Sequence, residues 1–404
     1  MKVRGNALVA HGGGPTTVLN SSLAGIVEEC RSAGIEKLFG ALGGATGILE
    51  ETFADLLAAD LLAEPEWFWG QVALSPGSLI GSSRAKIAEH DFETMLNVLR
   101  RHDVRYIFLN GGNGTMELSL RLSQAIANSS YEAFVVGVPK TIDNDLAITD
   151  HSPGYASAAR FFAYAVRDIG ADNRALPGIT VVEILGRNAG WLAAATIQAR
   201  RHPDDAPHLI YMPERPLPFD QLADDVEKCY LRLGRAVIAV CEGQLDAKGE
   251  PFGADTRVSS RAPLALNLAH VLSQRLSKTL KVSARSEKPG LLGRSCSALV
   301  SEVDRAEAFE CGRAAVRAAI AGIAGKMITL ERKPGPAYEC TTGLADLADV
   351  AAQERLFPRA WLPEEPTDDM PAFRAWLEPL TGPIPPLPLL GGGISSSGCL
   401  TLKD

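Results

Sequence analysis

The order of apolar runs, glycine-rich turns and helical patterns constrains the fold of this chain more than any other feature. Residues 6–10 indicate a strand, a glycine-rich turn follows, and helical periodicity extends from about 18 to 32. Residues 106–109 begin the same order again, and a third apolar run at 133–138 stops at Pro139. Strands that alternate with helices predict βαβ units and a parallel sheet.

The second half of the chain continues in the same style. Three further apolar runs with strand character lie at 179–184, 208–212 and 236–240, with helical patterns between them. Residues 331–404 are richer in proline, and the glycine- and serine-rich stretch at 391–397 is typical of a flexible tail. We therefore expect an α/β protein with an appended C-terminal segment.

Composition disfavours several other classes of protein. A net charge of −8 and a pI near 5.5 argue against a nucleic-acid-binding surface. No apolar run approaches the roughly 20 residues that span a bilayer, so no membrane association is expected. The seven cysteines are scattered without a CxxC pair, which favours reduced thiols and offers no zinc site. No secretory signal is visible after Met1, so we expect a cytoplasmic protein.

The turn at 139–145 places two carboxylates, Asp143 and Asp145, two positions apart just after an apolar strand. Ligands of open α/β sheets bind at the carboxyl ends of strands, where this turn is expected to lie. One carboxylate is suited to act as a base, the other to hold a metal, and Lys140 to meet an anion. The alternative is a purely structural, hydrogen-bonded Asp-Asn-Asp turn.

Glycine-rich turns at 12–17, 111–115 and 186–190 each follow a strand and precede a helix. Backbone N–H groups at a helix N-terminus attract anions, although a single glycine turn often only closes a βα connection. None of the three is a dinucleotide fingerprint or a Walker loop, which argues against a nicotinamide-dependent dehydrogenase. Two such turns beside a double-aspartate turn favour phosphoryl transfer, which requires positioning, a divalent metal, cationic charge and a base.

Together these motifs resemble those of the phosphofructokinase A family. Five segments occur in the family's order: Gly13-Gly14 with Asn20, 111–115, 139–145, 183–187 and Glu242-Gly243. The resemblance covers most of the chain, and the regions 82–84 and 358–359 look most like the long bacterial pyrophosphate-using branch.

The resemblance implies two Rossmann-like three-layer lobes with mostly parallel sheets and an active site in the cleft between them. It assigns residues 1–154, with a returning segment at about 293–345, to a lobe that binds the phosphoryl donor. It assigns 155–292 to a sugar-phosphate lobe and 346–404 to the appended segment. It also implies a homodimer or homotetramer.

Individual roles follow from the same resemblance. Asp143 is the base toward the sugar 1-hydroxyl, and Asp145 and Asn113 belong to the Mg²⁺ environment. The donor-binding residues are Gly13, Arg84, Gly112, Gly114 and Thr115. The residues on the sugar-phosphate side are Thr141, Asp143, Asp145, Leu185, Gly186, Arg187, Glu242, Arg285 and Arg294, and one of the two last arginines is reached from a neighbouring subunit. Lys140, Thr141 and Arg187 act beside Asp143 in catalysis.

Two positions bear on the choice of donor. Pyrophosphate users usually carry an aspartate at the position of Gly114, where its carboxylate fills the space of the ATP α-phosphate. Glycine leaves that space open and favours ATP, whereas Lys140 and the overall resemblance favour pyrophosphate. From the sequence we lean narrowly to ATP.

The acceptor site departs from the family pattern at Gly178, where a cation is usual, and at Leu291, where His or Tyr is usual. Arg174 is a candidate substitute for the missing cation. The expected acceptor is fructose 6-phosphate, with a related sugar phosphate such as sedoheptulose 7-phosphate as the alternative. A non-catalytic, sugar-phosphate-binding regulatory subunit is the alternative of another class. We expect Trp191 to be a core residue.

Overall fold

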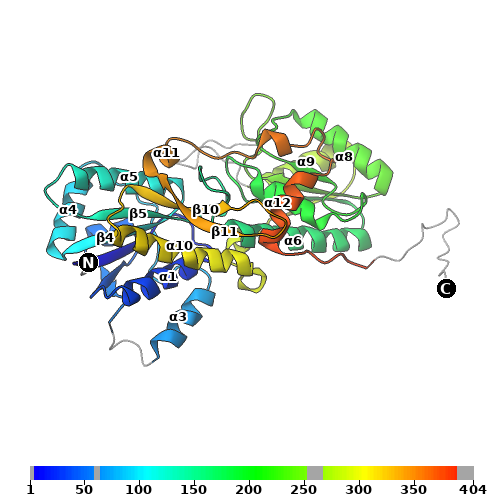
Figure 1. The fold of residues 1–404 in the computed structure, drawn as a ribbon. Coiled ribbons are helices and arrows are strands. Elements are labelled where there is room, and N and C mark those ends of the chain that lie inside the picture. Colours follow the sequence, from blue (N-terminus) through cyan, green and yellow to red (C-terminus); the bar gives the residue numbers. More distant parts are fainter. Residues whose placement is uncertain (1–3, 59–63, 253–266, 389–404) are drawn as a thin grey trace.

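The computed structural model describes residues 4–58, 64–252 and 267–388, and it contains two β-sheets that lie in separate lobes (Figure 1). The tail at 391–397, which we expect to be flexible, lies outside the described residues. The first sheet has the strand order β11-β10-β5-β4-β1-β2-β3. Its strands are β1 (Asn6–His11), β2 (Leu38–Ala41), β3 (Phe53–Asp55), β4 (Val104–Gly111), β5 (Phe134–Pro139), β10 (Lys326–Arg332) and β11 (Cys340–Asp346).

The five inner strands of this sheet pair in parallel, and only β3 and β11 at its edges run antiparallel to their neighbours. Side chains that alternate along β1 serve two cores, since Ala7 and Val9 face one layer of helices and Leu8 and Ala10 the other. One layer consists of α1 (Leu19–Ser32), α3 (Pro65–Leu74) and α10 (Glu302–Ile320). The other consists of α2 (Ala45–Leu49), α4 (Asp91–Arg101) and α5 (Asn113–Ala127).

The second sheet is entirely parallel, with the order β7-β8-β6-β9. Its strands are β6 (Ile179–Ile184), β7 (Leu209–Tyr211), β8 (Ala236–Cys241) and β9 (Ala284–Glu287). One face packs against α6 (Tyr155–Ala175), α7 (Trp191–Ala195) and α12 (Pro371–Thr381), and the other against α8 (Phe219–Leu233) and α9 (Leu268–Leu280). The expectation of an α/β fold with mostly parallel sheets is confirmed.

The C-terminal segment is packed into the second lobe by aromatic side chains. Trp191 is fully buried and lies 5.1 Å from the ring of Phe357 and 5.5 Å from that of Trp376, measured between ring centroids. Phe373 adds a further ring against Phe357 at 5.0 Å. Aromatic contacts of this kind contribute about 0.5–1.5 kcal/mol each beyond their buried area. Trp191 is therefore a core residue, as expected.

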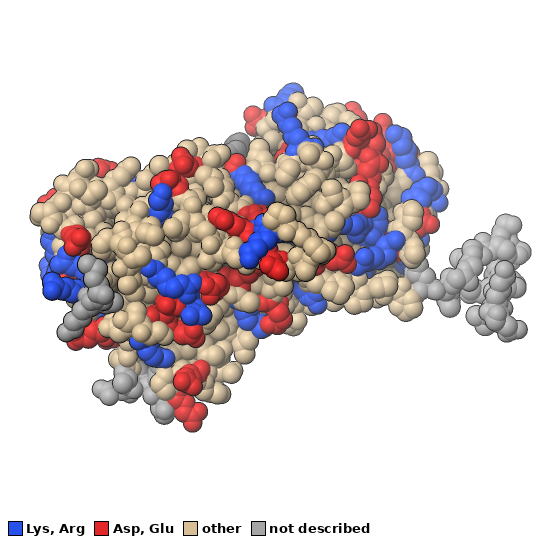
Figure 2. All heavy atoms as spheres, viewed as in Figure 1, with Lys and Arg blue, Asp and Glu red and all other residues tan. Residues whose placement is uncertain are grey.

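The remaining elements are short and connect the lobes and their sheets. Among the described residues these are α11 (Leu347–Ala351) and the 3₁₀ turns η2 (Thr196–Ala199), η3 (Gly290–Arg294), η4 (Ser297–Leu299) and η5 (Arg359–Trp361). Acidic and basic side chains are interspersed over the face of the molecule in Figure 2. Among the described residues, no helix is long and apolar enough to cross a membrane.

All six apolar runs named in the sequence form strands, but four strands of the first sheet (β2, β3, β10 and β11) and β9 of the second sheet were not predicted. Of these, β10 and β11 lie more than 180 residues after β5 in the chain and join the sheet at its β5 edge. Neither strand is part of a βαβ pattern, so local periodicity carries no signal of their pairing. The domain boundaries proposed from the sequence stay a prediction.

Candidate active site

A cavity of about 780 Å³ opens between the two lobes at the carboxyl ends of β1, β4 and β5. Most of the residues singled out in the sequence line it. They are Gly13, Arg84, Gly112, Asn113, Gly114, Thr115, Lys140, Thr141, Asp143, Asp145, Leu185, Arg187, Glu242 and Arg294. Because residues of the second lobe line the same cavity as the turns of the first, two different ligands can meet in it.

The two glycine turns of the first lobe are fitted tightly to each other. Gly13 has a φ of +79°, and its amide donates to the carbonyl of Ser83 over 2.9 Å. A Cβ at Gly111 would lie 2.1 Å from Oγ1 of Thr115, so a larger residue does not fit there. A Cβ at Gly12 would also lie 2.1 Å from Oγ1 of Thr115, so glycine at these positions allows a turn of positive φ and a close approach of the two segments.

Lys140 joins the glycine turn at 12–14 to the catalytic turn at 139–145. Its buried ammonium donates to the carbonyl oxygen of Gly12 over 2.9 Å and to that of Gly14 over 2.7 Å. Burial lowers the pKa of Lys140 to about 8, although the neighbouring carboxylate of Asp143 opposes this effect. Lys140 therefore brings positive charge to the floor of the cavity.

Two arginines reach the same glycine turn from different parts of the chain. A Cβ built at Gly14 would lie 2.5 Å from Nη1 of Arg294 and 3.2 Å from Nη2 of Arg84. Arg294, expected on the sugar-phosphate side, thus also lies against the donor turn. With Lys140, three cationic groups surround a backbone turn, which is an arrangement suited to a polyphosphate.

Asp143 lies in the cavity with an unusually basic carboxylate. Burial raises its pKa above the usual range, and the neighbouring carboxylates of Asp145 and Glu242 raise it further, against the effect of Arg187. A carboxylate of raised pKa is suited to take a proton from a hydroxyl.

The hydrogen bonds that hold the turn at 139–145 are made by Asn144 and Thr141 and not by the two aspartate side chains. Asn144, at a φ of +55°, accepts a hydrogen bond from the amide of Ser152 over 3.0 Å, and Thr141 Oγ1 accepts one from the amide of Asp143. These contacts hold the turn, while the carboxylates of Asp143 and Asp145 line the cavity.

Asn113 and Asp145 present oxygen atoms that fit a hard divalent cation. The amide nitrogen of Asn113 donates to Oδ2 of Asp145 over 2.9 Å. The Oδ1 atom of each residue is buried and finds no hydrogen-bond partner among the described residues. Carboxylate and amide oxygens are the ligands that Mg²⁺ prefers, so the pair fits the Mg²⁺ environment expected from the sequence.

On the side of the second lobe, Gly186 stands behind the cavity rather than in its lining. Its amide approaches Oε1 of Glu242 at 3.4 Å, and burial raises the pKa of that carboxyl. Arg187 and Leu185, its neighbours, do line the cavity. The turn therefore presents a cation and holds Glu242 beside it.

The structure does not bring Arg285 to the cavity. This residue lies on β9 with its side chain 57% exposed, 3.8 Å from the carboxylate of Asp172. Arg174, the candidate substitute cation, is not among the residues that line the cavity and pairs with Asp205 over 3.0 Å. Leu291 is exposed on η3 and is not among the residues that line the cavity.

Asn188 and Glu354 also line the cavity. Asn188 belongs to the glycine-rich turn at 186–190, whereas no sequence motif marks Glu354. The amide nitrogen of Asn188 lies 3.0 and 3.1 Å from the two carboxylate oxygens of Glu354. The next residue, Arg355, donates its backbone N–H to the carbonyl of Asp145 over 2.8 Å. The C-terminal segment thus forms part of the cavity wall, and no motif marks it because its partners are distant in the chain.

The cavity between the two α/β lobes brings together a glycine turn with three cations and a carboxyl of raised pKa. This combination is typical of an enzyme of phosphoryl transfer. The comparison with known families agrees, since the family model described as "Phosphofructokinase" matches residues 6–319. The chain therefore belongs to the phosphofructokinase family, and the prediction of a phosphotransferase is confirmed.

Similar proteins extend over nearly the whole chain. A pyrophosphate–fructose 6-phosphate 1-phosphotransferase of Rhodospirillum rubrum is 36% identical over 389 residues, which cover 94% of this chain and 95% of that protein. An ATP-dependent 6-phosphofructokinase of Amycolatopsis methanolica is 32% identical over 261 residues, 61% of this chain and 55% of that protein. The crystal structure of a pyrophosphate-dependent phosphofructokinase from Nitrosospira multiformis has a TM-score of 0.84 and 28% identity, and covers 99% of this chain and 98% of its own.

Proposed function

We propose that this chain transfers a phosphoryl group from pyrophosphate to the 1-hydroxyl of fructose 6-phosphate, with Mg²⁺ as cofactor. The observation that carries the proposal is the placement of Asp143 in one cavity with three cations around the turn at Gly14. Asp143 is then adjacent to a cationic cradle for the donor, formed by Lys140, Arg84 and Arg294 around Gly14, as in-line phosphoryl transfer requires.

In the proposed reaction, Asp143 takes the proton of the 1-hydroxyl as that oxygen attacks the terminal phosphorus. The bridging P–O bond breaks, and orthophosphate leaves toward Lys140, Arg84 and Arg294, whose charges stabilise it. Arg187 neutralises charge on the sugar-phosphate side. Mg²⁺ held at Asn113 and Asp145 would offset the negative charge of the donor's phosphates.

The choice of donor rests on two opposing observations. A Cβ built at Gly114 meets nothing within 4 Å, so the position leaves room for a nucleotide and favours ATP. Four relatives that match over 93–94% of the chain are named as pyrophosphate–fructose 6-phosphate 1-phosphotransferases, and a fifth, at 94%, is named a sulfofructose kinase. The ATP-dependent relative matches over 61% of the chain. The narrow sequence-based lean to ATP finds no support there, and we keep ATP as the second candidate.

The other expectations from the sequence enter this proposal as well. The first lobe is proposed to bind the donor and the second the sugar phosphate. Arg285 lies outside the cavity of its own chain, which supports a homo-oligomer in which such a cation comes from a neighbouring subunit. A cytoplasmic location stays a prediction.

The decisive experiment is an assay of purified protein with Mg²⁺, each donor and each acceptor. Pyrophosphate and ATP are combined with fructose 6-phosphate and sedoheptulose 7-phosphate, and ³¹P NMR follows the products. We expect fructose 1,6-bisphosphate and orthophosphate from pyrophosphate. Turnover with ATP alone would favour the second candidate, and no turnover with any pair would favour the non-catalytic sugar-phosphate-binding subunit.

A further inference from the structure

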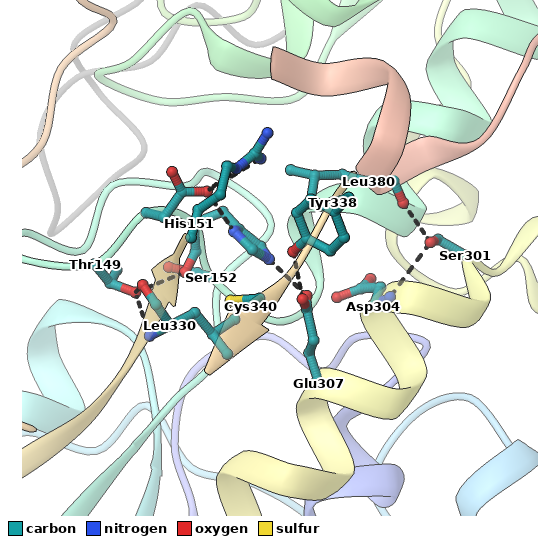
Figure 3. Close-up of polar contacts among 12 residues, drawn as sticks. Thr149, His151, Ser152, Ser301, Asp304, Glu307, Leu330, Tyr338, Cys340 and Leu380 are labelled. Atoms are coloured by element: carbon teal, nitrogen blue, oxygen red, sulfur yellow. Dashed lines mark hydrogen bonds and ion pairs between the residues drawn. The ribbon is translucent and has the colours of Figure 1, made fainter. Parts of the chain in front are cut away.

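His151 is a fully buried imidazole on the loop that follows the catalytic turn. Its Nδ1 lies 2.8 Å from Oδ2 of Asp150, and its Nε2 lies 2.6 Å from Oε2 of Glu307 on α10 (Figure 3). Ionised carboxylates only accept hydrogen bonds, so both ring nitrogens donate in this arrangement. His151 is therefore an imidazolium ion held between two acidic partners.

The surroundings of this ring stabilise its charge. Burial alone would lower the pKa of His151, but the hydrogen bonds to Asp150 and Glu307 outweigh it and raise the pKa to about 9. The charged and titratable groups that surround the ring or its two partners are Asp150 and Arg355, Glu307 on α10, Arg332 on β10, Tyr338 before β11 and Cys340 on β11. Arg332 also pairs with Asp150 at 3.1 Å, so the cluster is close to charge balance.

Residues 150–154, the His151 limb, pack directly against the catalytic turn at 139–145. The amide of Ser152 donates to Oδ1 of Asn144, which stands between the two catalytic aspartates. The amide of Thr141 donates to the carbonyl of Pro153 over 3.1 Å. These two contacts involve Thr141 and Asn144, which lie on either side of Asp143 in the chain. A displacement of the His151 limb would therefore also displace Asp143.

Helix α10 holds this limb at two points one turn apart. Glu307 contacts His151, and Asp304 accepts hydrogen bonds from the amides of Gly154 at 2.8 Å and Ser157 at 3.0 Å. Figure 3 shows Asp304 and Glu307 projecting from the same helix toward this loop. Since α10 itself packs along α1 in the core of the first lobe, it is a rigid support for the catalytic turn.

We propose that His151 is a positioning residue, whose paired ring ties the catalytic turn to α10 and so fixes Asp143 and Asp145 relative to the donor site. This inference rests on the proposed function. A buried ion pair is weak evidence for stability, because desolvation costs about as much as the pairing gains, whereas it is well suited to fix one geometry. Its loss should therefore appear in turnover more than in binding.

Kinetics of His151→Gln and of the milder Glu307→Gln test the positioning role. We expect kcat to fall about 10- to 100-fold, with the KM of the sugar phosphate within about twofold, since misplacement by about 1 Å costs that much. The control is His208→Gln, which replaces another buried histidine in the second lobe, at β7, and should leave kcat within about twofold. Unchanged kcat in a folded His151→Gln protein would overturn the proposal.

Two readouts separate this proposal from the proposed function, because neither needs turnover. In ¹³C-histidine NMR of the wild type, the resonance that His151→Gln removes should titrate near pH 9 and shift to lower pH in Glu307→Gln. Amide hydrogen exchange at Thr141, Ser152 and Gly154 should be at least tenfold faster in His151→Gln. A resonance that titrates near 6.5, or exchange that is unchanged, contradicts the positioning role even if phosphoryl transfer itself is confirmed.

Discussion

The side-chain amide of Asn113 donates a hydrogen bond of 2.9 Å to the carboxylate of Asp145, and the remaining side-chain oxygen of each residue is buried without a partner among the described residues. The amide thus supports a carboxylate whose pKa is raised by burial. Asparagine at this position supplies a donor where an aspartate would supply a second negative charge. The hydrogen bond therefore holds Asn113 and Asp145 together in the absence of a cation, and the two unpartnered oxygens can still bind a cation.

Replacing Asn113 by aspartate should make the protein depend on the cation. In the absence of Mg²⁺, the lost donor and the new like charge should lower the free energy of unfolding by about 1–3 kcal/mol. Added Mg²⁺ should then raise the Tm of Asn113→Asp more than it raises that of the wild type. Equal Mg²⁺ responses, measured by calorimetry, would contradict a metal environment at these residues.

Replacing Asp143 by asparagine should remove the base and preserve the shape of the turn. We expect kcat to fall by about 10²–10⁴-fold while the affinity for the sugar phosphate stays within a few-fold. Isothermal titration and steady-state kinetics separate the two effects. Asp168→Asn is the matched control, since Asp168 is an exposed residue of α6 whose ion-pair partner among the described residues is its neighbour Arg167. Full activity in Asp143→Asn would rule out the assigned role.

Lys140→Met should weaken both the donor site and the glycine turn. The substitution removes a charge near the leaving phosphate and two hydrogen bonds, to the carbonyls of Gly12 and Gly14. We expect kcat to fall at least about 100-fold and the donor KM to rise, because hydrogen bonds of charged groups contribute about 1.5–3 kcal/mol each. The same substitution at the exposed Lys37 should leave both constants unchanged. If only the KM of the sugar phosphate changed, Lys140 would act at the acceptor site and the assignment to the donor site would be wrong.

Gly114→Asp tests the donor directly. Open space surrounds this position, so an aspartate fits without a clash and places a carboxylate where a nucleotide would extend. Any activity with ATP should be lost, whereas activity with pyrophosphate should stay within about threefold, since the charge lies beyond the shorter donor. Gly70→Asp on α3, another glycine with open space around it, controls for the cost of aspartate in a helix. Loss of both activities together would show that the new charge reaches the transferred phosphate.

Stability should fall in mild acid because of His208. Burial lowers its pKa to about 4, and its Nδ1 accepts a hydrogen bond from the amide of Val237, which requires a neutral ring. Between about pH 6.5 and 4 the unfolded state binds the extra proton, so the free energy of unfolding decreases as pH falls, by at most about 3 kcal/mol. Denaturant titrations of wild type and His208→Gln over this range should show a flatter pH dependence in the variant. Identical slopes would exclude His208 as the cause.

The sequence predicted the six strands β1, β4, β5, β6, β7 and β8 because each is an apolar run with its own local signal. The strands β2, β3 and β9 are only three or four residues long, too short for a clear periodic signal, and were missed. β10 and β11 were missed because β10 pairs with β5 from far along the chain, and the pairing of distant strands leaves no local pattern. The aromatic packing of Trp376 and Phe373 on Trp191 is equally non-local, so the C-terminal segment looked merely appended.

Within the site, the short motifs indicated the residues whose chemistry is recognisable from type and spacing. Asp143 and Asp145 were found in this way and Arg187 through the family resemblance, and the structure places all three in one cavity. Glu354 was not found, because its role depends on a contact with Asn188 that lies 166 residues away. The position of Arg294 beside Gly14 was also beyond a sequence argument, since it depends on how the lobes close.

By itself, the sequence determined the class of chemistry, because glycine turns and paired aspartates at strand ends carry their function in residue type and local order. Only the tertiary structure decided which charges act together. Lys140, Arg84 and Arg294 form one cationic cradle, and His151 becomes an ion held between Asp150 and Glu307, through contacts between segments that are remote in the chain. Electrostatic strength depends on distance and burial, and both exist only once the chain has folded.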